Sequence, residues 1–190
     1  MADSARRGFV PTRSLAGGGS GALRSKLYHT SANRSSPLFV GDAVSMAAAQ
    51  GELIRTTSAS ADSTNYVGIV QALYDTNKKP LQGTGRIFLN TSVAGWVGVM
   101  DDPNAVLLVE CETTIDQSRV GAVAWINVSA NSLSSATGIS KTSVNLTSAA
   151  GGIPLFRIIG LAPTEVAVTA DGSLNNDVEI VAIDGLFRSH

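Results

Sequence analysis

The two histidines of this chain offer little chemistry. They are His29 and His190, and neither lies in a metal-ligand or nucleophile motif. A zinc site or a Ser-His-Asp triad would require these distant positions to converge in space. The sequence therefore disfavours a catalytic or metal centre built on histidine.

The single cysteine lies between two acidic residues. Cys111 is flanked by Glu110 and Glu112, whose charges oppose formation of a thiolate. We expect a half-buried structural cysteine that forms no internal disulfide. On a strand the two glutamates would face the same way, with Cα atoms about 7 Å apart. They could form a carboxylate pair, but solvated charges on an outer face are the favoured interpretation.

Two loop motifs also have a chemical interpretation and a structural one. Residues 101–104, Asp-Asp-Pro-Asn, offer oxygen ligands for Ca²⁺ but lack the spacing of a dedicated calcium loop. A turn in which aspartate accepts backbone hydrogen bonds is favoured. Residues 17–21, Gly-Gly-Gly-Ser-Gly, lack the Gly-Lys-Ser/Thr ending of a phosphate loop and are expected to form a flexible hinge.

The two tryptophans are the remaining candidates for ligand contact. Trp96 and Trp125 could stack against sugars or bases, but each lies inside an apolar run. Core packing is therefore the favoured interpretation for both.

The basic residues that could position a partner are concentrated at the start of the chain. Residues 1–36 hold six of the fourteen basic side chains and one acid, whereas residues 37–190 hold eight basic and fourteen acidic side chains. The first segment is also rich in glycine and serine and poor in apolar runs. We interpret it as an extended cationic arm, ordered by what it binds, ahead of a single β-rich domain at 37–190.

The body reads as strands almost throughout. Glycine, serine and threonine make up 56 of 190 residues, which lowers helix propensity. Apolar or alternating runs separated by turn residues predict strands, with the clearest at 37–46, 66–74, 95–100, 105–112, 120–128, 154–161 and 178–183. About ten short strands predict an all-β barrel or sandwich. No apolar run approaches the roughly 20 residues of a membrane-spanning helix, and no secretory signal is expected.

Short motifs follow one another in a particular order from residue 8 to the C-terminus. They are Gly-Phe-Val-Pro at 8–11, Leu-Phe-Val-Gly-Asp-Ala-Val at 38–44, Val-Gly-Ile-Val at 67–70, Val-Met-Asp-Asp-Pro at 99–103, Phe-Arg-Ile-Ile-Gly-Leu at 156–161 and Asn-Asn-Asp-Val-Glu-Ile-Val-Ala-Ile at 175–183, with a terminal histidine. In this order they resemble the small head decoration (capsid cement) proteins of tailed bacteriophages. The segment after Leu161 and residues 184–190 depart from that pattern.

The resemblance implies a β-rich clamp on the outer surface of an assembled capsid, with the major capsid protein as partner. It implies no catalysis, and no cofactor is expected. The formal net charge of −1 gives no reason to expect nucleic acid or a membrane surface as partner, and the composition leaves a monomer, a dimer or a trimer open. The arm would order on the capsid by strand addition. Arg6, Arg7, Arg13 and Arg24 would pair with acidic patches of the coat, and Phe9, Val10 and Leu15 would be apolar anchors.

Two alternatives remain from the sequence. A spike or receptor-binding virion protein would share the β-rich composition and could use the polar stretch at 129–150 to engage carbohydrate. An enzyme acting on glycans would use Glu110 or Glu112. The scarcity of catalytic groups makes the enzyme the less favoured alternative.

Overall fold

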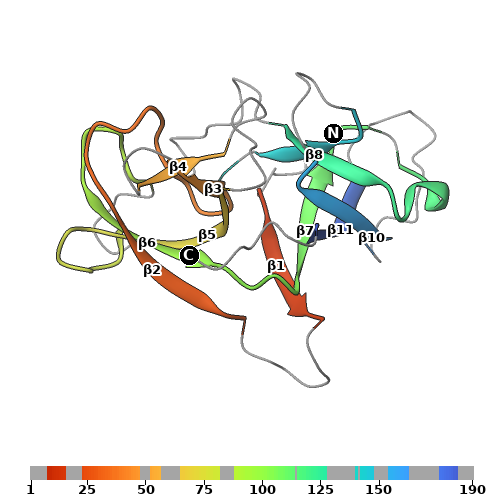
Figure 1. Cartoon of the computed structure of the whole chain (residues 1–190), viewed down its shortest axis with the longest axis horizontal. Coiled ribbons are helices and arrows are strands. Elements are labelled where there is room, and N and C mark those ends of the chain that lie inside the picture. The colour runs from red at the N-terminus through yellow and green to blue at the C-terminus, as the bar shows by residue number, and fades with distance from the viewer. Residues whose placement is uncertain are drawn as a thin grey trace, which may run out of the picture.

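The chain is all-β, as the sequence predicts. The computed structural model describes residues 8–15, 23–47, 52–56, 65–81, 88–113, 115–127, 140, 142–147, 154–162 and 176–183. Within these ranges, eleven strands and one short 3₁₀ helix, η2 (Gln117–Arg119), form two sheets that lie side by side (Figure 1). No helix in these ranges has the length and apolar character needed to cross a membrane.

The first sheet closes into a small barrel. Its strands, in spatial order, are β1 (Val10–Ser14), β7 (Ala105–Cys111), β11 (Asn176–Ala182), β10 (Phe156–Leu161), β8 (Val123–Asn127) and β9 (Ser143–Asn145). Strand β9 returns to β7 through the parallel pair Cys111 and Val144. The ring of five strands from β7 to β9 is therefore complete, and β1 pairs with the first half of β7.

The second sheet is open and antiparallel. Its strands, in spatial order, are β2 (Ser25–Thr30), β6 (Gly95–Met100), β5 (Tyr66–Tyr74), β3 (Ala43–Met46) and β4 (Leu53–Arg55). The sheet curls so that the hydroxyl of Thr30 at the end of β2 donates to the carbonyl of Leu53 in β4, at 3.4 Å. Its two edge strands thus approach each other at one end.

Alternation along the second sheet builds two cores. On β5, Tyr66 and Ile69 join the core of the barrel, whereas Val67 and Val70 join a separate core within the second sheet. Successive side chains of a strand point to opposite faces, so Tyr66 and Val67 serve different cores, as do Ile69 and Val70. Tyr66 and Ile69 share a core although they are three residues apart, because the register of β5 against β3 shifts between them. Gly68 allows the close approach of β5 and β6, because a Cβ atom there would lie 2.0 Å from the carbonyl oxygen of Met100.

The predicted boundary between an arm at 1–36 and a body from residue 37 is wrong for the described part of that segment. Residues 10–14 pair with β7, and every residue of β2 has a partner on β6. Both strands lie at sheet edges, where one side stays in water and the sequence carries little apolar signal. The folded body therefore includes part of the supposed arm.

Candidate functional site

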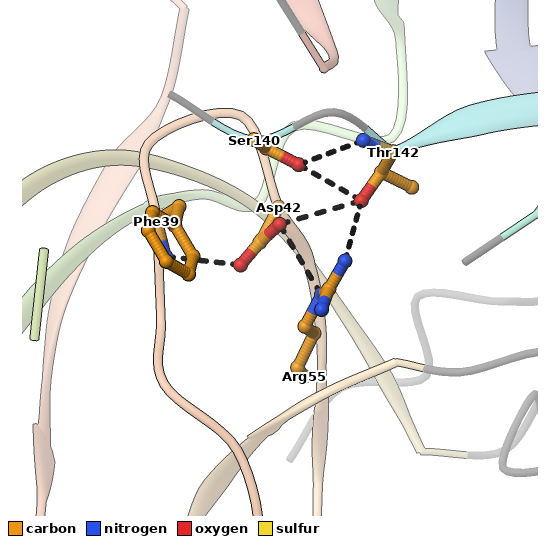
Figure 2. A network of polar contacts seen from close by, with 5 residues as sticks. All are labelled: Phe39, Asp42, Arg55, Ser140 and Thr142. Atoms are coloured by element: carbon orange, nitrogen blue, oxygen red, sulfur yellow. Dashed lines mark hydrogen bonds and ion pairs between the residues drawn. The ribbon is translucent and has the colours of Figure 1, made fainter. Parts of the chain in front are cut away.

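A buried polar network joins the two sheets at one turn (Figure 2). The carboxylate of Asp42 lies 3.4 Å from Nε of Arg55, and both side chains are almost fully buried. The other carboxylate oxygen accepts from the backbone N–H of Phe39 at 2.9 Å. Thr142 donates to Asp42 at 3.3 Å and accepts from Arg55 at 3.2 Å, and Ser140 donates to Thr142 at 2.8 Å.

The turn that carries Asp42, residues 39–42, is here called the central turn. Its backbone receives three distant segments: Phe9 N–H donates to Gly41 C=O, Ser140 N–H donates to Val40 C=O, and Gly41 N–H donates to Val70 C=O. Gly41 has a φ of 87°, which favours glycine. Burial raises the pKa of Asp42, while Arg55 opposes that rise. The network fixes the sheets to each other, which is a structural role.

The carboxylates beside the cysteine are structural as well. Glu110 is buried, so the expectation of solvated charge on an outer face is wrong for this residue. Glu112 accepts hydrogen bonds from Ser143 Oγ at 2.7 Å and from Asn127 Nδ2, which ties β7 to β8 and β9. Cys111 is fully buried rather than half-buried, and burial raises the pKa of its thiol. These contacts hold together the strands at which the barrel closes.

The loop at 101–104 is a turn, as favoured from the sequence. The carboxylate of Asp102 accepts from the backbone N–H of Asn104 at 2.9 Å. Asp101 forms an ion pair with Arg24 at 2.9 Å. Among the residues that the structure describes, no group of three His, Cys, Asp or Glu side chains could hold a metal ion.

The predicted capsid-binding residues separate into a buried group and an exposed group. Phe9 is buried against Phe156, with ring centroids 5.1 Å apart, so its assignment as an exposed anchor is wrong. Burial of its apolar ring in the barrel core is favourable because it removes the ring from water. Val10 is partly buried on β1 opposite Leu108. Leu15 is 54% exposed and remains accessible as an apolar contact.

The basic residues of the same prediction are partly engaged within the chain. Arg13 makes two hydrogen bonds with Glu179 of β11, at 2.5 and 2.8 Å. Arg24 makes two with the carboxylate of Asp101, at 2.9 and 3.0 Å. These hydrogen bonds raise the pKa of each guanidinium. Arg6 and Arg7, the other basic members of the set, lie outside the described residues, as do His190 and residues 17–21 and 128–139.

A row of aromatic rings was missed by the sequence analysis. His29 on β2, Trp96 on β6 and Tyr74 on β5 are direct cross-strand partners and therefore share one face of the second sheet. Further along β6, the same face buries Met100 against the barrel. Trp96 lies at the other end of the strand and is only partly buried, so the expectation of core packing is wrong for it.

The class that these features define is an all-β protein with a barrel, a second sheet and a structural polar centre. No family model, curated protein or solved structure matches the chain. The case for a function therefore depends on the residues of the chain and on the surfaces that its strands expose.

Proposed function

We propose that this chain is a non-enzymatic virion structural protein of the decoration type, which binds the outer surface of an assembled phage capsid and stabilises contacts between major capsid protein subunits. The observation that carries the proposal is the placement of residues 8–15 and 23–30. They supply an edge strand to each sheet, β1 and β2 (Figure 1). They also carry the large apolar side chains most open to solvent among the described residues, Leu15 at 54% and Leu27 at 45%.

Edge strands suit this function physically. An edge presents backbone N–H and C=O groups that an extended segment of another protein can pair with, and side chains beside the edge provide specificity. Each contact can be weak, because a shell repeats it in many copies and a clamp that spans two subunits gains from effective concentration. Leu27 lies on β2 and Leu15 directly follows β1, so both exposed leucines lie beside these edges.

The N-terminal basic residues have a secondary part in the proposal. Arg13 and Arg24 are exposed and ion-paired with Glu179 and Asp101. Exchanging one exposed ion pair for another gains little free energy, because water screens both pairs. Attachment should therefore depend more on Leu15 and on backbone pairing than on charge, and it should persist at high salt.

The test is co-sedimentation with expanded capsid shells that lack any decoration protein. The full chain is compared with Leu15→Ser, with a chain lacking residues 1–7, and with Arg119→Ser, an exposed position on η2 that serves as control. We expect saturable binding by the full chain and by the control, and at least tenfold weaker binding by Leu15→Ser, which corresponds to about 1.4 kcal/mol. The proposed function is refuted if the full chain binds expanded shells neither in low salt nor in high salt.

A further inference from the structure

A surface beside the β2 edge has the composition of a protein-binding site. It consists of Leu27, His29, Tyr74, Lys78 and Trp96 and is here called the Trp96 surface. The three rings lie in register across β2, β6 and β5, with the imidazole of His29 edge-on to Trp96 at a centroid distance of 5.2 Å. Partly exposed aromatic side chains flanked by a cation are typical of the residues that dominate binding energy at protein interfaces.

The cation of this surface is held in place by its turn. The Lys78 ammonium lies 4.5 Å from the centroid of the Trp96 ring. Lys78 has a φ of 61°, an uncommon conformation for a residue with a side chain. The Asp75 carboxylate fixes the turn by accepting from the backbone N–H groups of Asn77 and Lys79, each at 2.8 Å. Less conformational entropy is lost on binding when a lysine is already positioned in this way.

The apolar part of the surface lies directly beside the rings. Leu27 is 45% exposed on β2, and its cross-strand partner is Gly98, which has no side chain to cover it. One residue, Tyr28, separates it from His29 on the same strand, so both point to the same face. The result is an exposed aliphatic group next to an aromatic row, with a cation over the central ring of that row.

We propose that the Trp96 surface docks an acidic patch with an apolar centre on a second protein, the coat subunit of the proposed function. The inference rests on that function and adds a contact separate from Leu15. Charge favours this occupant: the Lys78 ammonium is exposed and lies over Trp96, whereas the Asp75 carboxylate is engaged by the turn. An acidic group of the partner would meet Lys78, and an apolar group would cover Leu27.

The same observations argue against nucleic acid as the occupant. Single-stranded nucleic acid binds through bases that stack on open ring faces and through phosphates along a basic groove. Here the Trp96 ring already carries Lys78 over its face and His29 at its side. The exposed leucine offers nothing to a phosphate, and the formal net charge of the chain is −1. A net charge so close to zero gives no general attraction for an extended polyanion.

The experiment uses the full chain with Trp125→Phe, so that fluorescence reports Trp96, titrated with expanded shells and separately with oligothymidylate. Lys78→Glu and Leu27→Ser are the test variants. Lys79→Glu is the matched control, because it makes the same charge change in the same turn at a lysine that does not lie over Trp96. Thermal melting checks that each variant is folded.

We expect the Trp96 emission to shift to shorter wavelength when the chain binds shells. Lys78→Glu and Leu27→Ser should each weaken binding to shells at least about tenfold. Lys79→Glu should weaken it less than about threefold. Unchanged emission at saturation, or equal losses for Lys78→Glu and Lys79→Glu, would overturn the inference while the capsid function stands. A response to oligothymidylate but not to shells would assign the surface to nucleic acid and overturn it. If no form of the chain binds shells, the proposed function and this inference both fail.

Discussion

Removing the carboxylate of Asp42 is the perturbation for which the structure gives the clearest magnitude. Asp42 is fully buried and faces Arg55, whose side chain is only 4% exposed. In Asp42→Ala the guanidinium stays buried while its counter-charge is lost, and the backbone N–H of Phe39 loses its acceptor in the turn. Breaking a buried pair in this way costs about 3 to 5 kcal/mol, out of a total free energy of unfolding of about 5 to 15 kcal/mol.

The assay is urea unfolding followed by tryptophan fluorescence. With a denaturant dependence of about 2 kcal/mol per molar urea, Asp42→Ala should lower the midpoint by about 1.5 to 2.5 M. Asp116→Ala is the control, because Asp116 is an exposed carboxylate that caps η2. Loss of such a cap costs about 1 kcal/mol.

The double variant Asp42→Ala with Arg55→Met tests the physical reason. Replacing both charges by apolar groups removes the buried guanidinium that has lost the Asp42 carboxylate, so at least half of the lost free energy of unfolding should return. The reasoning is refuted if Asp42→Ala costs no more than Asp116→Ala, or if the double variant is no more stable than Asp42→Ala alone.

Three further predictions concern the strand core and its buried titratable groups. Gly68→Ala should strongly destabilise the protein or make it insoluble, because the new Cβ would lie 2.0 Å from the Met100 carbonyl oxygen. Gly98→Ala, whose new Cβ would have its nearest contacts at 3.5 Å, should lower the free energy of unfolding by less than about 1 kcal/mol in the same urea assay. Cys111 should react with a disulfide reagent at pH 8 only after unfolding, because burial raises its thiol pKa; rapid reaction of the native chain would contradict this. Burial also raises the pKa of Tyr66 above the ordinary tyrosine value of about 10, so the unfolded state loses this proton first and the free energy of unfolding should fall as pH rises above about 10. Tyr66→Phe should make that fall less steep, and an unchanged slope would exclude Tyr66 as its cause.

The strands of the body could be predicted because their pattern is local. The run at 66–74 coincides with β5, and the run at 95–100 coincides with β6. Their β-branched and aromatic residues, bounded by turn residues, identify a strand wherever it lies in a fold. The barrel was likewise indicated by the number of short strands, and its closure through Cys111 and Val144 is a long-range contact that no local pattern contains.

The N-terminal strands were missed for a physical reason. In β2 the residues at 25–27 are all exposed, so the segment has the composition of a linker although every residue is paired to β6. Edge strands gain their order from backbone pairing with a neighbour, and that neighbour lies about 70 residues later in the chain. The sign of the charge at 1–36 was a correct observation, but it did not imply a separate arm.

The polar centre and the Trp96 surface could not be read from spacing. Asp42 and Thr142 are 100 residues apart, and they meet because the central turn receives the segment ahead of β9. Trp96 looks like a core residue in the sequence because its neighbours Val97 and Val99 are apolar. Its side chain points to the face of the sheet opposite to that of Val97 and Val99, beyond the end of the barrel core.

The central claim is that this chain binds the outside of a capsid through its N-terminal edge strands. Cryo-electron microscopy of expanded shells with and without the full chain tests it most directly, through a difference map. The account predicts added density on the outer surface at repeated positions, with β1 and β2 turned toward the coat. Absence of added density at saturating protein, or density that contacts the shell through β8 and β10 instead, would contradict it.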